Sequence, residues 1–320
     1  MKRREFVGLL GGAAMWPLAV RAQSDRVRRI GLMANSPHQP IGRFQAKLRD
    51  LGYAEGKNLI IEFRFSEGRD ERYASFASEL VALPVELLVA WGTPAAIAAK
   101  NATSRIPVVI TVGDVINTGL VSDLAHPGGN ITGFVALNVE IEEKRFELLK
   151  EVLPRLSKVA VLSNRANPLN KINSERVRRA AERQSIAIDV FEIQKADEVE
   201  AALAAIGAAH PDAVIVASDT LLLGERKTIA AAMSGNGIPA IYPFREYADV
   251  GGFVAYGANI SALFERSALY VQRILNGESP GNLPAQQATT FDIIINLKAA
   301  ARLGLTLPPS VLARADEVIE

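Results

Sequence analysis

The sequence predicts an α/β protein with two doubly wound parallel-sheet lobes, joined by a hinge with a ligand cleft between them. Three observations predict this class. Short runs of apolar and β-branched residues alternate with helix-like stretches, which is the pattern of parallel sheets covered by helices on both faces. The runs are too numerous for one compact sheet, so two lobes are needed. Polar loops follow several of the runs, and ligands of open α/β sheets bind at these carboxyl ends of strands.

Each expected strand is a short apolar run, and each expected helix is a longer stretch with a spaced apolar face. In chain order the strands are Arg29–Met33, Leu59–Phe65, Leu87–Ala90, Val108–Val112, Ile131–Ala136, Val159–Ser163, Ala187–Ile193, Ala213–Ala217, Ala240–Tyr242, Phe253–Tyr256 and Phe291–Asn296. The helices are Gly42–Leu51, Asp70–Leu83, a segment that begins at Thr93, Glu140–Leu153, Asn170–Gln184, Asp197–Ala209, Leu221–Gly237 and Ser261–Asn276. Gly52, Pro84 and Pro154 follow three of these helices, at positions where glycine or proline ends a helix.

Turn-rich segments indicate where the chain passes from one lobe to the other. Pro127-Gly128-Gly129-Asn130 has no apolar period, and the rhythm of strand and helix restarts after it. The pattern of strands and helices changes a second time at Tyr256-Gly257-Ala258-Asn259. Residues 278–284 then form a polar connection rich in proline and glycine. We expect residues 1–22 to be an export signal, residues 23–134 plus 257–283 to form the first lobe, and residues 135–256 plus 284–320 to form the second.

The first twenty-two residues have the composition of an export signal. Lys2-Arg3-Arg4 is a basic start, Phe6 to Val20 carries no charge, and Val20-Arg21-Ala22 ends in a small residue suited to cleavage near Ala22. The Arg3-Arg4 pair followed by Phe6 resembles a twin-arginine signal, although the general export route stays open. Fifteen uncharged residues interrupted by glycine and proline are fewer than a transmembrane helix needs. We therefore expect the mature chain in the periplasm.

Composition excludes several classes of protein. The chain of 320 residues has no cysteine, which excludes disulfides, thiolate metal sites and a lipid-modified cysteine after the signal. Residues 1–22 hold four of the 36 basic and one of the 35 acidic side chains, so the mature chain has a net charge near −2. This balance gives no reason to expect nucleic acid or anionic lipid as a partner. We expect a monomer.

Motifs of enzymes and of nucleotide sites are poor. The three histidines are far apart, and none has metal-ligand spacing with a carboxylate. Residues 277–281 match the nucleophile-elbow pattern, but they follow a helix instead of a strand, and Pro280 opposes the helix that must follow the serine. Neither a dinucleotide fingerprint nor a phosphate loop is present. The sequence therefore predicts no catalytic residue, no cofactor and no metal.

The polar loops after the strands are the candidate ligand site. After the third strand, Gly92 suits a turn, Thr93 suits a helix N-cap and Pro94 suits the first helical position. Such a helix start presents N–H groups and a partial positive charge to a small anion such as a carboxylate. A cation could be received by Asp219, Glu246 or Asp114. Taken singly, each loop residue is better explained as a helix cap than as a ligand contact, since serine, asparagine and aspartate routinely cap helices.

The chain also resembles the substrate-binding proteins of ABC transporters of the tryptophan/tyrosine type, which have the type I periplasmic binding protein fold. The matching stretches are Arg29-Ile30-Gly31-Leu32, Leu51-Gly52-Tyr53-Ala54-Glu55-Gly56-Lys57-Asn58-Leu59, Gly92-Thr93-Pro94-Ala95-Ala96, Ile106-Pro107-Val108-Val109, Thr118-Gly119-Leu120-Val121, Pro127-Gly128-Gly129-Asn130-Ile131-Thr132-Gly133, Ile238-Pro239-Ala240-Ile241-Tyr242 and residues 296–305. They span nearly the whole mature chain. The chain departs from the family where it has Asp114-Val115 in place of Asp-Pro, and Thr220-Leu221-Leu222 in place of an aromatic pair.

The resemblance implies a soluble protein that captures a small carboxylate-bearing solute, an amino acid or an aromatic acid, between its lobes. It implies delivery to an inner-membrane permease that a cytoplasmic ATPase drives. Thr93, Ala95 and Ala96 would hold the carboxylate, Asp219 would receive an ammonium group, and Tyr242 and Phe244 would form aromatic walls. The full set of expected ligand-binding residues is Ser36, Thr93, Ala95, Ala96, Asp114, Asn164, Asn167, Asp219, Tyr242 and Glu246.

Two other interpretations of the sequence stay open. An exported enzyme is the first, because twin-arginine export often carries folded, cofactor-bearing proteins, although no nucleophile with its base is visible. The second is the ligand-sensing module of a regulator, because repressors use the same two-lobe fold. Such regulators carry a DNA-binding domain ahead of the first lobe, whereas here an export signal and Ser24-Asp25-Arg26-Val27 precede the first strand.

Overall fold

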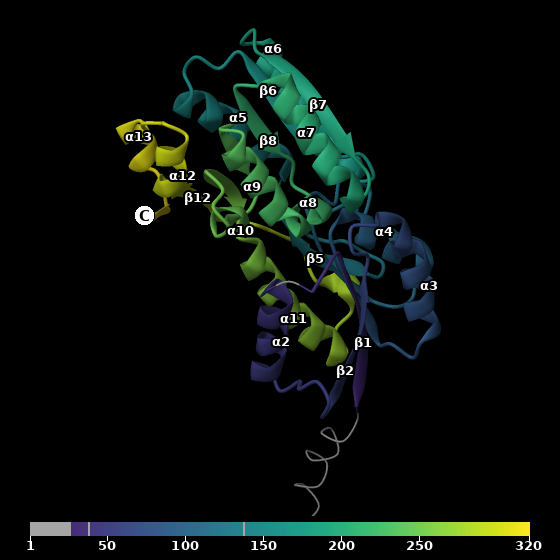
Figure 1. The fold of residues 1–320 in the computed structure, drawn as a ribbon. Helices are drawn as coiled ribbons and strands as arrows, with labels where there is room; N and C mark the ends of the chain where they lie inside the picture. Colours follow the sequence, from purple (N-terminus) through teal and green to yellow (C-terminus); the bar gives the residue numbers. More distant parts are fainter. Residues whose placement is uncertain (1–26, 38, 137) are drawn as a thin grey trace, which may run out of the picture.

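The computed structural model describes residues 27–37, 39–136 and 138–320. Its strands form two sheets, one in each half of the elongated molecule (Figure 1). The first sheet has the order β11-β5-β4-β3-β1-β2, and its strands are β1 (Arg28–Ala34), β2 (Leu59–Phe65), β3 (Leu87–Trp91), β4 (Val108–Val112), β5 (Ile131–Val135) and β11 (Gln286–Gln287). Every pairing in this sheet is parallel.

The second sheet has the order β13-β12-β10-β9-β8-β6-β7. Its strands are β6 (Lys158–Asn164), β7 (Ala187–Ile193), β8 (Ala213–Val216), β9 (Ala240–Tyr242), β10 (Val254–Ala258), β12 (Phe291–Asn296) and β13 (Glu317–Ile319). Its pairings are parallel except that of β10 with β12. Two parallel-dominated sheets with flanking helices confirm the predicted fold class.

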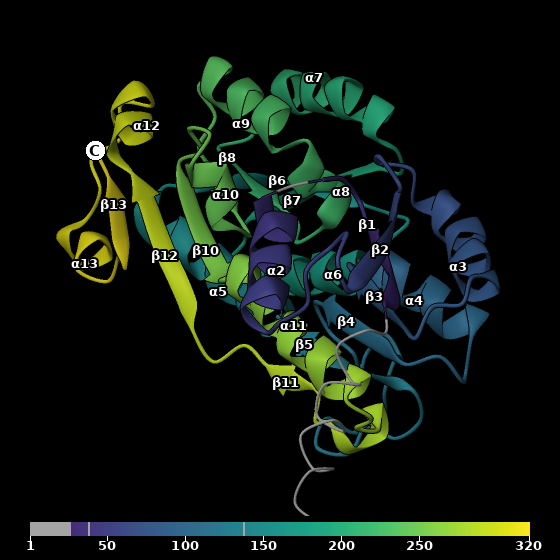
Figure 2. The same ribbon diagram turned by 90° about the horizontal axis from the view of Figure 1, so that it is seen from below.

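Helices cover both sheets, and Figure 2 shows α2 and α11 side by side, next to the strands of the first sheet. With the first sheet lie α2 (Gln39–Asp50), α3 (Tyr73–Ala82), α4 (Thr93–Ala102), α11 (Ile260–Leu275) and the short 3-10 turns η1 (Asp70–Arg72) and η3 (Pro280–Asn282). With the second sheet lie α5 (Asn138–Val152), α6 (Pro168–Glu182), η2 (Ala196–Glu198), α7 (Val199–Ala209), α8 (Thr220–Gly224), α9 (Arg226–Gly235), α10 (Arg245–Ala248), α12 (Leu297–Arg302) and α13 (Pro309–Leu312). In each half, packed helix pairs such as α3 with α4 and α5 with α6 shield the sheet from solvent.

The chain crosses between the two sheets in three places. It crosses between β5 and α5, between β10 and α11, and between β11 and β12. Since β5 runs to Val135, β10 to Ala258 and β11 to Gln287, these crossings fall a few residues later than the sequence suggested. We propose lobe bounds on this basis: lobe 1 takes the elements up to β5 plus α11 through β11, and lobe 2 takes α5 through β10 plus β12 onward.

The structure divides one expected helix and adds short elements. The helix expected over 221–237 is broken at Glu225, whose φ of −90° and ψ of 13° are not helical, and α8 and α9 lie on either side. Three consecutive leucines of α8 are buried, whereas its first and last residues are partly exposed, and α9 buries one face only. The strands β11 and β13 and the helices α10, α12 and α13 were not expected, because two to six residues carry no measurable period.

Among the residues that the structure describes, one of three apolar clusters extends across both lobes. It joins Phe44, Trp91 and Phe264 of lobe 1 to Leu222 and Phe244 of lobe 2. The other two clusters each belong to one lobe. Because apolar surfaces of the two lobes are in contact, the lobes are closed on each other in this structure.

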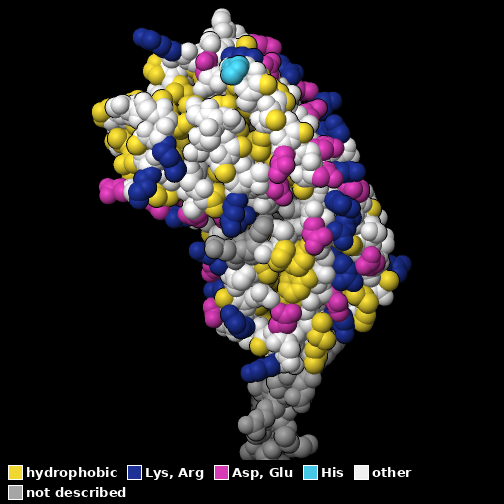
Figure 3. All heavy atoms as spheres, in the orientation of Figure 1, with side chains coloured by type: hydrophobic (Ala, Val, Ile, Leu, Met, Phe, Trp, Pro, Cys, Tyr) yellow, Lys and Arg dark blue, Asp and Glu magenta, His cyan; other side chains and the backbone are white. Residues whose placement is uncertain are grey.

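The expected export signal, residues 1–22, lies outside the described residues. Within the described part, none of the helices has the length and the hydropathy that crossing a membrane requires. On the face shown in Figure 3, basic and acidic side chains are interspersed.

Candidate ligand-binding site

The loop between β3 and α4 brings the first lobe into contact with the second. Gly92 has φ 93° and ψ 150°, a backbone conformation that is open almost only to glycine. Its N–H donates to the carbonyl oxygen of Thr111 at 2.9 Å, which fixes the loop to β4. A Cβ at Gly92 would lie 2.8 Å from Oγ1 of Thr220 in lobe 2. The glycine is therefore needed both for the turn and for the approach of the lobes.

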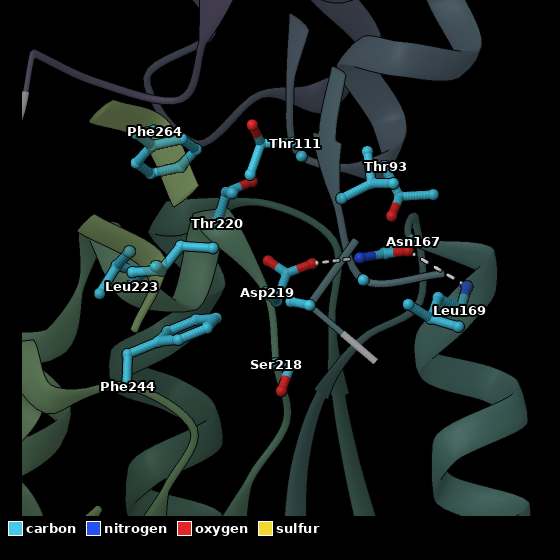
Figure 4. A pocket seen from close by; sticks show the side chains of 15 residues that line it. Thr93, Thr111, Asn167, Leu169, Ser218, Asp219, Thr220, Leu223, Phe244 and Phe264 are labelled. Atoms are coloured by element: carbon cyan, nitrogen blue, oxygen red, sulfur yellow. Dashed lines mark hydrogen bonds between the residues drawn. The ribbon is translucent and has the colours of Figure 1, made fainter. Parts of the chain in front are cut away.

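A cavity lies at the strand ends between the lobes, with an empty volume of about 440 Å³ that includes its open mouth. In Figure 4, Thr93, Thr111 and Phe264 border it on one side, and Ser218, Asp219, Leu223 and Phe244 border it on the other. Its other lining residues are Gly92, Val112, Gly113, Ala136, Asn167, Leu169, Thr220 and Ile260. The carboxyl ends of parallel strands are where α/β proteins hold small ligands.

A second cavity adjoins the first and is more apolar. It has an empty volume of about 330 Å³ and shares Thr220, Leu223 and Phe264 with the first cavity. Its remaining lining residues are Ala34, Asn35, Ser36 and Trp91. The rings of Trp91 and Phe264 are 4.2 Å apart between centroids. The cleft thus has a polar end and an aromatic end.

Asp219 is the charged group of the polar end. It is 3% exposed, and its carboxylate caps α8 by accepting from the N–H groups of Leu221 and Leu222 at 2.8 and 3.2 Å. The side-chain amides of Asn167 and Asn164 also donate to it, at 2.8 and 3.2 Å. Burial raises the pKa of Asp219, and these donors oppose the rise. These amide and backbone donors fix the position of the Asp219 carboxyl group at the wall of the cavity.

The structure changes the roles expected at the start of α4. Thr93 lines the cavity and is 2% exposed, but the N-cap is Gly92, and no side chain caps this helix. Ala95 and Ala96 are fully buried and do not line the cavity. The Ala96 N–H donates to the carbonyl oxygen of Gly92 at 3.0 Å, so it is not available to a ligand. Among these residues, only the N–H groups of Thr93 and Ala95 stay as candidate donors.

Other expected residues hold the scaffold together. Asp114 does not line the cavity, and its carboxylate accepts from the N–H groups of Ile116 and Asn117 within its own loop. Tyr242, the last residue of β9, is 1% exposed and stacks on Tyr247 in the core of lobe 2. It is not a wall of the site, whereas Phe244 lines the cavity as expected.

The four remaining expected residues differ in their position relative to the two cavities. Asn167 lines it and caps α6 through the N–H of Leu169. Asn164 is fully buried behind Asp219, and Ser36 lines the second, apolar cavity. Glu246 does not line either cavity; its carboxylate accepts from the hydroxyl of Ser261 at 2.8 Å, and this bond joins α10 of lobe 2 to α11 of lobe 1.

Sequence reasoning missed the contribution of α11. Ile260 and Phe264 of this helix line the cleft, although they are far from the lobe 1 strands in sequence. No local signal marks them, since they occupy the same apolar face that buries α11 in the protein. Trp91 could have been found, because it directly precedes Gly92 at the end of a strand. Asp70, which contacts Asn164 from lobe 1, was placed inside an ordinary helix.

Two α/β lobes with a cavity at facing strand ends define a ligand-binding protein that closes around a small molecule. A family model described as "ABC transporter substrate binding protein" matches residues 35–319. The chain belongs to this family, whose members are the substrate-binding proteins of ABC transporters. The predicted family and fold are thereby confirmed.

Individual relatives are similar over almost the whole chain. A tyrosine-binding protein of Clostridioides difficile is 27% identical over 308 residues, which are 93% of this chain and 88% of that protein. The crystal structure of an ABC domain from Streptococcus pneumonia in complex with L-Trp is 26% identical, with a TM-score of 0.81, over 92% of this chain and 100% of that one.

A ligand-free, open structure helps to interpret the lobe arrangement. It is that of a substrate-binding protein with adhesive properties from Clostridium difficile, which is 26% identical over 92% of this chain and 99% of that one, with a TM-score of 0.60. At equal identity and coverage, the L-Trp complex superposes far better on this chain. This agrees with the closed lobes of this structure.

Proposed function

We propose that this chain captures an amino acid with an aromatic or large apolar side chain and delivers it to a membrane permease. The observation that carries the proposal is the two-ended cleft. Asp219 and the start of α4 face the polar cavity, while Trp91, Leu223 and Phe264 line the adjoining apolar one. An amino acid has a cation, an anion and a side chain to match these three surfaces. The names of the relatives that carry tyrosine and L-Trp support the same class.

The expected arrangement follows from the charges of the two lobes. The ammonium group would pair with Asp219, and the carboxylate would lie at the N-terminus of α4 near Thr93. One helix N-terminus contributes about 0.3–1 kcal/mol, or up to about 2 kcal/mol when partly buried. Micromolar affinity needs about 8 kcal/mol, so the aromatic surface must supply much of the rest. Burial of a large side chain contributes about 1.5–3 kcal/mol.

Export and partners complete the proposal. The basic and then uncharged start of the chain supports an export signal cleaved near Ala22 and a periplasmic monomer. Closure over a solute presents the two lobes in one fixed relation, which an inner-membrane permease with its ATPase can recognise. Ligand favours this closed form only by its differential affinity for the two forms.

Calorimetric binding to residues 23–320 tests the proposal, after any copurified ligand has been removed by refolding. L-Tyrosine, L-tryptophan, L-phenylalanine and their analogues without the amino group are the probes. We expect amino acids to bind at least tenfold more tightly than the deaminated analogues, and Asp219→Asn to abolish this preference. Asp212→Asn is the matched control, since its carboxylate lies in lobe 2 but binds Ser157 and Lys158 away from the cleft. No binding of any probe would refute the proposed ligand class.

A further inference from the structure

Away from the cavity, a second contact joins the lobes at the turn that follows β2. The N–H of Ala196 in lobe 2 donates to the carbonyl oxygen of Gly68 in lobe 1 at 3.1 Å. Arg69 and Lys195 form an isolated antiparallel bridge beside it. Asp70, the next residue, is thereby enclosed between the lobes and is 8% exposed.

Asp70 shares one amide group with Asp219. The Asn164 side-chain nitrogen lies 3.0 Å from Oδ2 of Asp70 and 3.2 Å from both carboxylate oxygens of Asp219. The two carboxyl groups, one from each lobe, therefore come within about 6 Å of one another. Like charges this close in a buried place cannot both be ionised without a large cost.

The two carboxyl groups differ in how well a negative charge is held. Asp219 accepts from two backbone N–H groups and from Asn167 in addition to Asn164. Asp70 has the Asn164 bond alone, and its Oδ1 has no hydrogen-bond partner among the described residues. A proton on the pair is therefore more stable on Asp70, where Oδ1 can carry it.

The charged and titratable groups that face Asp70 do not compensate its charge. They are Asp219, Glu71 and the hydroxyl of Tyr73, and within the described part of the chain no ion pair with a basic side chain is found for Asp70 or Asp219. Burial raises the pKa of Asp70 to about 7, and the charge of Asp219 is the second cause.

We propose that the two lobes close with uptake of one proton from solvent onto the Asp70 carboxylate. Opening moves Asp70 away from Asn164 and Asp219 into water, where a carboxyl group has its ordinary acidity and releases the proton. The closed form is then favoured in acid. The ratio of closed to open protein falls about tenfold for each rise of one pH unit between the ordinary pKa of Asp70 in the open form and its raised pKa in the closed form. Above about pH 7 the ratio levels off. An ammonium group bound at Asp219 would bring one positive charge to the carboxyl pair, as the proton on Asp70 does, and would therefore also favour the closed form.

Distance measurement across the cleft tests this inference without any solute, so its outcome is independent of the proposed ligand class. The chain has no cysteine, and exposed positions on helices flanking the contact can carry spin labels as Ala74→Cys in α3 and Glu200→Cys in α7. Pulsed electron paramagnetic resonance at pH values from 5 to 8 then gives the closed fraction of the ligand-free protein.

We expect a closed population at pH 5 whose ratio to the open population drops by at least tenfold by pH 7. In the Asp70→Asn background this dependence should vanish, because the side chain is neutral at every pH. Glu71→Gln is the matched control: it removes the neighbouring, exposed carboxylate and should keep the dependence. A closed fraction that is zero or constant from pH 5 to pH 8 in the otherwise wild-type chain would overturn the inference, as would an unchanged dependence in Asp70→Asn.

Discussion

Replacement of Gly92 by alanine should weaken ligand binding by blocking the approach of the lobes. The new Cβ would stand 2.8 Å from Oγ1 and 3.0 Å from Cγ2 of Thr220, and both distances are shorter than the ordinary contacts of a Cβ atom. Thr220 belongs to lobe 2, at the start of α8, so this contact exists only when the lobes are closed. The substitution therefore acts on closure as well as on folding.

The two effects have separate magnitudes. A nonglycine residue at φ 93° and ψ 150° costs about 1–3 kcal/mol of stability, or roughly 2–4 °C in melting temperature for each kcal/mol in a domain of this size class. Overpacking against Thr220 costs about another 1–3 kcal/mol. Since this second cost falls on the closed form alone, ligand affinity should fall roughly 5- to 150-fold.

Thermal unfolding and calorimetric binding of whichever amino acid binds wild type separate the two effects. Gly52→Ala is the matched control, because Gly52 has φ +92° and a Cβ added there would meet nothing within 4 Å. It should melt lower but bind as wild type. Adding Thr220→Ala to Gly92→Ala removes both close contacts and should restore most of the affinity while the loss of stability persists. Wild-type affinity in Gly92→Ala would refute the reasoning.

Two further substitutions test the core around the cleft. Arg145 forms a buried ion pair with Glu142 at 2.5 Å, and Arg145→Met leaves the Glu142 carboxylate without its cation. The free energy of unfolding, measured by urea titration, should fall by about 3–5 kcal/mol. An unchanged unfolding midpoint would contradict this. Phe264→Ala should cost about 3–5 kcal/mol of stability and also weaken aromatic ligands, because Phe264 lines both cavities. Phe146→Ala, buried in the core of lobe 2, should cost similar stability and leave binding intact.

Local pattern was sufficient for most strands. Leu59–Phe65, Val108–Val112 and Phe291–Asn296 have the expected bounds. Of these, Val108–Val112 is a central strand of the parallel sheet; it is buried throughout, as such strands are, and it ends where loop residues begin. Helix starts were less certain. Thr93 has the chemistry of a cap, yet the turn at Gly92 places its side chain in the cleft, where it caps nothing.

Some of the residues predicted for the site line the cavity, and others do not. Thr93, Asn167 and Asp219 line the cavity because the carboxyl ends of their strands meet there. Tyr242 also stands at the end of a strand, but its ring turns into the core beside Tyr247. Side-chain direction at a strand end depends on how the sheet is covered, and one sequence does not contain that information.

The sequence by itself determined the class of fold and the order of most strands and helices, and it predicted the edge of each sheet at which a ligand could bind. These follow from periodicity and from turn chemistry, which act over a few residues. Only the tertiary structure decided which distant segments complete the cleft. Phe264 returns to lobe 1 on α11, and Asp70 meets Asn164 from the opposite lobe. Such pairings depend on how whole layers of helices and sheets pack. The apolar face of a helix has the same pattern in sequence whichever layer it packs against.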